Sequence, residues 1–339
     1  GSTGLMETFL VSGACYSVFV AACALAQRTP EKVAHSADLV SNLSLSQRSP
    51  QFLLMATGFG LASTGSYAII STSHTMLMEM YGTRFPDLVT PSSGAAFVSM
   101  LGLANLGGRL IWPNVSDYLC KRNGGFQGRK LTFAAMWTVS PLAFAGVLAS
   151  PYMPGTLAPL GLFVGSSMTA VSCLGGAAST RPAMVADSWG PNSVSTLIAR
   201  QMPVLLGAAF AGPKIVTTFR QSSTQEAAAQ LAAQIDDSVF EQAFHAPKSD
   251  LALLLQQKTA TLPYLMELCP GAVDPTPFLY TSGLGVCVAC QVCAFSTNLM
   301  LTAPTAAQGA DMVALGLAQP QKEEGSPDKE EEPAAADGK

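Results

Sequence analysis

The chain has 339 residues, of which 49% are hydrophobic and 12% are charged, and its formal net charge is -4. Soluble domains carry roughly 25% charged residues, so this composition excludes an ordinary soluble protein and predicts an integral membrane protein. The acidic balance also argues against a nucleic-acid partner, because no basic surface remains to neutralise phosphates.

Seven windows of about 20 apolar residues follow one another along the chain, and each is long enough to cross a lipid bilayer. They fall at 6–26, 52–72, 94–113, 131–150, 157–180, 193–212 and 277–303. The predicted fold class is therefore an all-α integral membrane protein with seven transmembrane helices. Glycine and serine are frequent inside the windows, which favours close packing between helices.

Lysine and arginine near the span ends predict the orientation, because cytoplasmic loops carry an excess of both. One side of the membrane receives eight such residues and the other receives three, Arg84, Lys214 and Arg220. The richer side is expected to be cytoplasmic, so the chain begins outside and the acidic tail at 304–339 is a disordered cytoplasmic segment. Arg181, at the cytoplasmic end of the fifth span, is interpreted as a topological residue.

The connection at 219–276 is predicted to be a long outer loop. Ser223 is a candidate helix N-cap, with Glu226 three residues later and an Ala-rich run up to Ala246. The apolar stretch from Leu251 to Met266 contains two glutamines, a lysine and a proline. It is interpreted as an amphipathic segment on the membrane surface in preference to an eighth span.

The sequence predicts neither a metal site nor a cofactor site. Cys287, Cys290 and Cys293 repeat every three residues along one helix face, with no histidine beside them to complete a tetrahedral site. Small packing side chains are the expected role of these cysteines. A nucleophile with a partner base is not apparent either, so the chain is not expected to be an enzyme.

Arg109 and Arg200 lie inside otherwise apolar windows. Each would cost roughly 2.5–3.5 kcal/mol at a bilayer centre, so such residues usually face a cavity, an anion or a carboxylate. Helix geometry places them about 8 and about 11 Å inside the cytoplasmic end. The alternative is that they snorkel to the headgroups, or for Arg109 that it joins a structural ion pair. Pro203 follows Arg200 and is a candidate hinge, because it frees a backbone carbonyl. Tyr67 and Trp137 are candidates either for a cavity wall or for packing.

A loop between the third and fourth windows carries a family resemblance. It runs from Asn105-Leu-Gly-Gly-Arg109 through Ser116-Asp117 to Gly128-Arg129-Lys130. This resembles the cytoplasmic loop signature of the major facilitator superfamily, which implies a gating role for Asp117, Arg129 and Lys130. An insertion of about eight residues, 120–127, leaves Lys121 and Arg122 as alternative basic partners. The other interpretation is a loop of topological value alone.

A second segment, Arg181-Pro-Ala-Met-Val-Ala-Asp187, is similar to a stretch in the oxalate:formate antiporters, a branch related to the monocarboxylate transporters. The resemblance covers roughly 1–218 and 277–303. It implies that residues 1–26 form helix six of a twelve-helix transporter, that 27–51 is the cytoplasmic loop between the halves, and that 52–303 is the six-helix C-terminal half. The chain is then expected to be a fragment whose partners include the lipid bilayer and the missing N-terminal helices.

The resemblance also implies a substrate. Arg109 lies eight residues before Asp117, and Leu197-Ile-Ala-Arg200 matches the helix-eleven segment, with Arg in place of Lys. In the antiporters these two positions flank a carboxylate substrate. The expected function is a membrane transporter that moves a small mono- or dicarboxylate by alternating access, as antiport, symport or facilitated diffusion. The alternative is a seven-helix membrane receptor, which would share the predicted topology.

Overall fold

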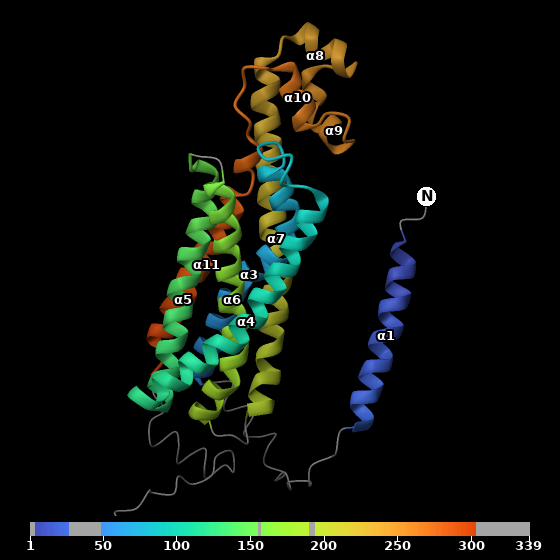
Figure 1. Ribbon diagram of the computed structural model, residues 1–339. Coiled ribbons are helices and arrows are strands. Elements are labelled where there is room, and N and C mark those ends of the chain that lie inside the picture. Colours follow the sequence, from blue (N-terminus) through green and yellow to red (C-terminus); the bar gives the residue numbers. More distant parts are fainter. Residues whose placement is uncertain (1–3, 27–48, 155–156, 190–193, 303–339) are drawn as a thin grey trace, which may run out of the picture. The chain divides into compact units, whose positions relative to one another are not determined.

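The computed structural model describes residues 4–26, 49–154, 157–189 and 194–302. These residues form helices and turns with no β-strand, and seven of the described helices are long and apolar enough to cross a membrane (Figure 1). The structure confirms that the described chain is all-helical and that seven of its helices could span a membrane. Most of the expected inter-half loop, 27–48, and the acidic tail lie outside the described residues.

Helix α1 (Leu5–Ala26) belongs to a separate unit, Gly1–Leu39. It is the most apolar of the candidate spans, with a mean hydropathy of 2.0. Glu7 is its one charged residue and lies in the first turn. At 1.5 Å per residue the helix is about 33 Å long, which matches the hydrocarbon thickness of a bilayer.

The second unit contains the other six long helices, which run in alternating directions (Figure 1). They are α3 (Pro50–Tyr81), α4 (Pro91–Asn123), α5 (Gly125–Ala149), α6 (Ala158–Trp189), α7 (Val194–Gln234) and α11 (Thr281–Met300). Helix α3 packs against α7 and α11, α4 packs against α5 and α6, and α5 also contacts α11. In the most apolar window of α3 61% of the residues are buried, against 22% in α4 and 17% in α7, so α3 is central and the other two are peripheral.

The helices extend well beyond the apolar windows. Helix α7 has 41 residues and α4 has 33, so they measure about 60 and about 50 Å against a hydrocarbon core of about 30 Å. A hydropathy window stops at the first polar run, whereas backbone hydrogen bonding continues through it. The prediction of a helix start at Ser223 is therefore wrong. Thr224 Oγ1 bonds Arg220 O inside the continuous helix, and the following Ala-rich run has the highest helix propensity.

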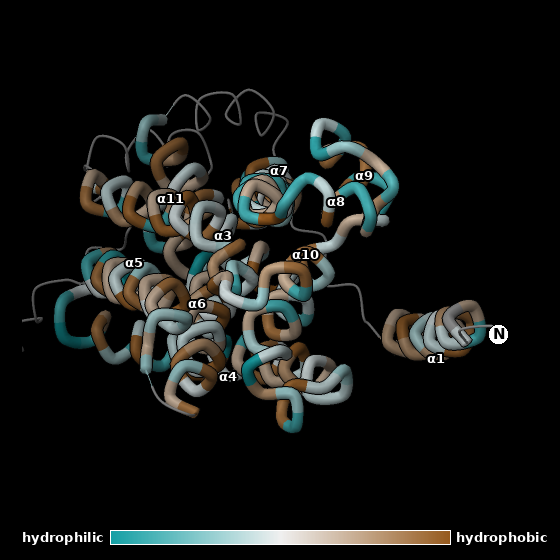
Figure 2. The backbone as a smooth tube through the Cα atoms, turned by 90° about the horizontal axis from the view of Figure 1, so that it is seen from above, coloured by the Kyte–Doolittle hydropathy of each residue, from teal (hydrophilic) through white to brown (hydrophobic). Residues whose placement is uncertain are grey.

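The segment after α7 folds back onto the end of α7, and we call the end of α7 and this segment together, residues 219–276, the extension. It contains α8 (Asp237–Phe244), η3 (Lys248–Asp250), α9 (Leu251–Gln256), α10 (Leu262–Leu268) and, at its end, the first residue of η4 (Thr276–Phe278). Leu231 of α7 packs there with Phe240, Leu254 and Leu265, all buried. The stretch 251–266 is therefore two short helices that pack on the extension core. Hydrophilic residues gather around α8 and α9 in the view along the bundle (Figure 2).

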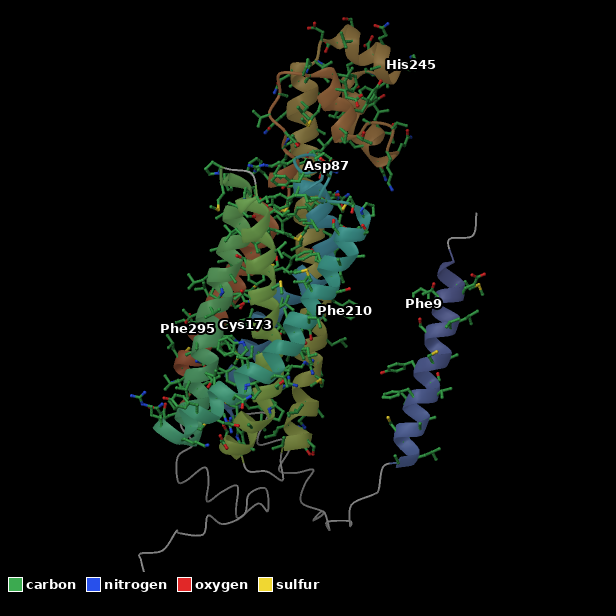
Figure 3. The ribbon with its side chains drawn as sticks, viewed as in Figure 1. Phe9, Asp87, Cys173, Phe210, His245 and Phe295 are labelled. Carbon is green, nitrogen blue, oxygen red and sulfur yellow. The ribbon has the colours of Figure 1, made fainter. Side chains whose placement is uncertain are left out.

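Glycine brings α4 and α6 into backbone contact. A Cβ added to Gly108 would lie 2.0 Å from Ser172 O, and one added to Gly175 would lie 2.1 Å from Asn105 O. Any side chain at these positions would force the helices apart, so the small residues set the α4–α6 distance. This packing fixes where Asn105 and its neighbours on α4 lie relative to α6. Side chains such as Cys173 lie inside the bundle, whereas Phe210 of α7 points out of it (Figure 3).

Candidate functional site

The junction between α4 and α5 is a tight corner. Gly124 adopts a φ of +84°, a conformation that L side chains rarely adopt, and so it lets the chain reverse between the two helices. Gly128 then packs directly on α4, because an added Cβ would lie 2.4 Å from Cys120 N. The expected insertion at 120–127 is thus absorbed into the end of α4 and the first turn of α5.

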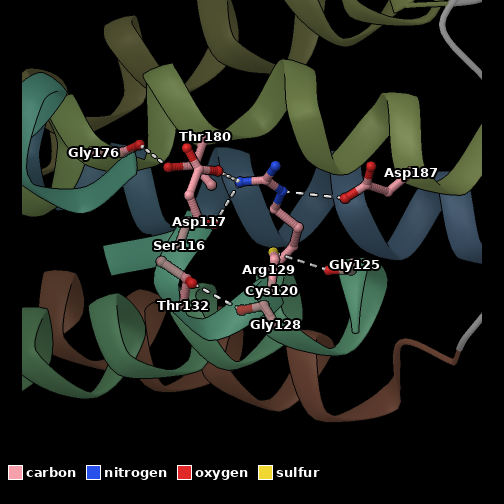
Figure 4. Close-up of polar contacts among 10 residues, drawn as sticks. All are labelled: Ser116, Asp117, Cys120, Gly125, Gly128, Arg129, Thr132, Gly176, Thr180 and Asp187. Atoms are coloured by element: carbon pink, nitrogen blue, oxygen red, sulfur yellow. Dashed lines mark hydrogen bonds and ion pairs between the residues drawn. The ribbon is translucent and has the colours of Figure 1, made fainter. Parts of the chain in front are cut away.

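Arg129 projects from the first turns of α5 into this corner (Figure 4). Its Nη1 donates to Asp117 Oδ1 at 2.6 Å and to Ser116 Oγ at 2.9 Å, and its Nε donates to Asp187 Oδ2 at 3.2 Å. We call Ser116, Asp117, Arg129 and Asp187 the corner cluster. The Arg129 side chain is 15% exposed, so these bonds form in a largely desolvated place. One guanidinium therefore ties α4, α5 and α6 together.

The structure separates the other basic residues predicted for the gate. Lys121 and Arg122 lie in the last turn of α4 and are exposed. Lys130 turns to the opposite side and donates to Leu299 O at 3.0 Å and to Leu301 O at 2.5 Å. These carbonyls end α11, so Lys130 caps a helix C-terminus, where a cation is favoured. Among the four candidates it is Arg129 that bonds Asp117.

Sequence reasoning missed two members of the corner cluster as site residues, Ser116 and Asp187, and only Asp187 is charged. It lies near the end of α6, in the last turn before Trp189, and its side chain is 32% exposed. The sequence contained a signal, because Asp187 ends the segment that carries the second resemblance. Only the packing of α6 against α4 and α5 shows that it shares Arg129 with Asp117.

A cavity of about 430 Å³ opens among α3, α4, α6 and α7. Val98, Leu101, Gly102, Asn105 and Arg109 reach it from one face of α4, at the spacing expected for a single helix stripe. The remaining lining residues are Phe59, Tyr67, Ile70, Leu174, Ala178 and Leu205. The wall is apolar except for the tyrosine hydroxyl, the asparagine amide and the guanidinium.

The Arg109 guanidinium is held in place by its own helix. Its Nε donates to Asn105 Oδ1 at 3.1 Å, one turn back along α4. The bond uses one side of the guanidinium and leaves the end of the fork, Nη1 and Nη2, for a ligand. Arg109 is thus a cation on the wall of an apolar cavity, and an arginine in such a position suits a carboxylate.

The structure does not bring Arg200 to the same wall. Arg200 is partly buried on α7, five residues before the cavity-lining Leu205, and the described lining does not include it. Pro203 lies between them and is exposed, within a helix that continues through it. Of the two aromatic candidates, Tyr67 lines the cavity, whereas Trp137 is buried in a hydrophobic cluster to which α3, α5, α6, α7 and α11 all contribute.

The interpretation of Arg181 as a topological residue is not supported by its position. Helix α6 continues to Trp189, so Arg181 lies within the helix and is 6% exposed. Its Cζ lies 4.5 Å from the centre of the Phe59 ring. Its Nε and Nη1 are buried and have no hydrogen-bond partner among the described residues. The apolar Met184 and Val185 that follow it were the sequence signal for a continuing buried helix.

A second polar cluster lies at the end of the bundle that carries the extension. Arg220 of α7 forms a two-pronged ion pair with Glu79 of α3, and Tyr280 Oη donates to Glu79 Oε2 at 2.6 Å. Glu79 and Arg220 also line a wider hollow of about 1010 Å³ beneath the extension. The carboxylate is neutralised by its partners, so this cluster is a structural tie between α3, α7 and the start of α11.

Comparison with known proteins gives no independent identification. No family model, curated protein or solved structure matches the chain. Among the described residues no group of three or more His, Cys, Asp or Glu side chains could hold a metal ion. Two features of the described residues are candidates for function. One is the cavity, whose apolar wall carries Arg109, and the other is the corner cluster, whose Asp117 lies about two helical turns further along α4.

Proposed function

We propose that the protein is a membrane transporter of the major facilitator type that moves a small organic anion. The observation that carries the proposal is the cavity of about 430 Å³ whose wall presents Arg109 among apolar side chains. A carboxylate would gain a charge-assisted hydrogen bond there, which is stronger than a neutral one. The cavity also borders the peripheral helices α4 and α7, as a site that must open to solvent requires.

The corner cluster supplies a second element of the proposal. Arg129 joins three helices at the end of the bundle where α4 meets α5. Alternating access requires contacts that hold one arrangement of helices and can be broken in another. The Arg129–Asp117 pair can open at small cost, because the Asp117 side chain is 62% exposed. We assign this cluster the role of a gate latch, with Arg129 as its centre.

The peripheral position of α4 and α7 agrees with a further bundle that would complete the cavity. Both helices expose large apolar side chains, among them Leu103, Leu110, Leu206 and Phe210. Arg200 has its place in this proposal as a cation on α7 that would face the same substrate from the other side of the pathway. We likewise propose that Pro203, three residues further along α7, acts as a hinge.

Uptake of labelled carboxylates into proteoliposomes by the full-length protein tests the proposal. The expected result is saturable uptake, which Arg109→Gln reduces with a rise in KM of about tenfold or more, because a hydrogen bond to a charged group contributes about 1.5–3 kcal/mol. Arg200→Gln is the parallel variant. Lys214→Gln, an exposed residue of α7, removes the same charge and is the matched control.

The same experiments distinguish a transporter from the alternative function, a seven-helix receptor. Saturable binding of a ligand by the purified protein, with no flux for any carboxylate, would favour a seven-helix receptor. Normal uptake and normal KM in both arginine variants would show that neither guanidinium contacts the substrate.

A further inference from the structure

A third and much smaller cavity, which we call the buried cavity, lies among α3, α5, α6 and α11. The space open to the centre of a water molecule there is about 10 Å³. One bound water needs about 10–15 Å³ by the same measure. The nine described residues that line the cavity are at most 9% exposed, so bulk solvent does not reach it. The size excludes a carboxylate or any other organic ligand.

Two of the lining residues carry complementary polar atoms. Trp137 Nε1 is a donor and Gln291 Oε1 is an acceptor, and neither has a hydrogen-bond partner among the described residues. The identity of the acceptor is fixed by the other end of the amide, because Gln291 Nε2 donates to Ala62 O at 2.6 Å. Both atoms are buried, and buried polar groups are almost always hydrogen-bonded. One ligand that accepts from the indole and donates to the amide oxygen would satisfy both.

Serine hydroxyls of α3 supply further acceptors to the same wall. Ser63 Oγ donates to Phe59 O at 2.7 Å. Ser66 Oγ donates to Ala170 O at 3.4 Å. Both hydroxyl hydrogens are therefore used within the protein, and the lone pairs of the two oxygens can still accept a hydrogen bond. The buried cavity thus offers one indole donor and at least three oxygen acceptors.

This set of groups suits water better than a cation. A water molecule can accept from Trp137 and donate to Gln291 and to one serine, and about three hydrogen bonds are typical of a buried water. A cation would meet the positive end of the indole N–H. The described lining also contains no carboxylate to offset the cost of taking a charge out of water.

The buried cavity adjoins the larger one that presents Arg109. Leu174 lines both cavities, whereas Cys173 lines the buried cavity and Ala178 lines the larger one. Phe59 repeats this arrangement on α3, because its side chain lines the larger cavity and its carbonyl accepts from Ser63. The two spaces are therefore separated by few side chains, and Leu174 is the one they share.

We propose that the buried cavity is a binding site for one structural water, bonded to Trp137 and Gln291, and that this water exchanges with the larger cavity past Leu174. The water gives α5 and α11 a hydrogen-bonded link between two side chains that have no direct partner in the described chain. The inference does not depend on the transport proposal, because it concerns hydration of the helix bundle and no substrate.

X-ray footprinting of the full-length protein in oxygen-18-labelled water tests the site. Radiolysis converts a bound water into a hydroxyl radical that oxidises the side chains beside it, and the label identifies water as the source. Trp137 is 3% exposed, and the control Met76, of comparable reactivity, is 1% exposed in the other hydrophobic cluster. We expect Trp137 to be oxidised faster by about tenfold or more. Equally slow oxidation of both residues would show that the buried cavity is dry and would overturn the proposal.

Two variants remove the water in different ways. Ala177→Val fills the buried cavity and keeps every polar group, so Trp137 oxidation should fall to the rate of Met76. Gln291→Leu removes the amide acceptor and should slow Trp137 oxidation by about tenfold. Unchanged oxidation in either folded variant would contradict the assignment. The comparison of Trp137 with Met76 in the wild type decides the matter even if neither variant folds.

Dilution from labelled into unlabelled water measures the exchange route. Leu174→Ala removes the shared side chain and should speed loss of label at Trp137 by about tenfold or more, whereas Leu205→Ala, which truncates the larger cavity alone, should not. Equal exchange times in the two variants would overturn the route past Leu174. Slower Trp137 oxidation in sodium chloride than in choline chloride would identify a bound cation and overturn the assignment to water.

Discussion

Replacing the partners of Arg129 one at a time tests whether burial or bond length sets the strength of the corner cluster. Arg129 lies 2.6 Å from Asp117 and 3.2 Å from Asp187, so bond length favours Asp117. Exposure favours the opposite order, since the Asp117 side chain is 62% exposed and that of Asp187 is 32% exposed. The variants are Asp117→Asn, Asp187→Asn and Arg129→Gln, alone and in pairs.

The magnitudes follow from how far solvent screens each pair. Exposed ion pairs contribute about 0.2–1 kcal/mol, whereas a hydrogen bond to a less solvated charge contributes about 1.5–3 kcal/mol. We expect the Arg129–Asp187 coupling to be about 1–2 kcal/mol and the Arg129–Asp117 coupling to be below about 1 kcal/mol. Arg129→Gln should be the most destabilising single change, at about 2–3 kcal/mol, because it also leaves the Asp187 carboxylate unpaired.

Double-mutant cycles on the free energy of unfolding in mixed micelles measure both couplings. Raising the ionic strength should weaken the Asp117 coupling first, because exposed charges are screened most effectively. A coupling to Asp117 that equals or exceeds the coupling to Asp187 would refute the reasoning. It would mean that bond length outweighs solvent exposure in this cluster.

Three further predictions concern helix packing and helix ends. Gly108→Ala should destabilise the protein by about 1–3 kcal/mol, because the new Cβ would meet backbone atoms of α6. In the control Gly107→Ala the new Cβ has no neighbour within 4 Å, so this variant should be neutral or slightly stabilising. Equal thermal midpoints for the two variants would contradict this. Lys130→Met should speed amide hydrogen exchange in the last turn of α11 and leave the exchange in mid-α5 unchanged, and no change at α11 would count against a capping role. Glu79→Gln should lower the free energy of unfolding by about 2 kcal/mol, because Glu79 loses its ion pair with Arg220. The control Glu226→Gln, at an exposed residue, should leave the free energy of unfolding unchanged. Similar losses in both variants would show that the Glu79–Arg220 pair does not tie α3 to α7.

The predictable part of the fold was the set of membrane-spanning helices. Their number follows from apolar length, which is a property of each segment alone, and all seven windows became helices. Helix ends were less predictable. Helix α6 passes through Pro182 and continues to Trp189, and α7 passes beyond Pro213 to Gln234, because backbone hydrogen bonding does not stop where hydropathy falls. A span boundary drawn at Thr180 therefore misplaced Arg181.

The candidate site was predictable only in part. Arg109 stood out as a charge inside an apolar window, and the structure places it on a cavity wall. Asp117 and Arg129 stood out through the loop motif, and the structure joins them. Asp187 gained its role only when α6 was seen beside the α4–α5 corner.

The sequence by itself determined which segments leave water, because the transfer free energy of a helix is a sum over its own residues. It also determined that a few charges interrupt those segments. Only the tertiary structure decided which of these charges share a site, because that depends on which helices are neighbours and on how closely glycine lets them approach. Backbone contact between α4 and α6 is what places Arg109 in one cavity wall with Leu174 and Ala178, and no single segment contains that information.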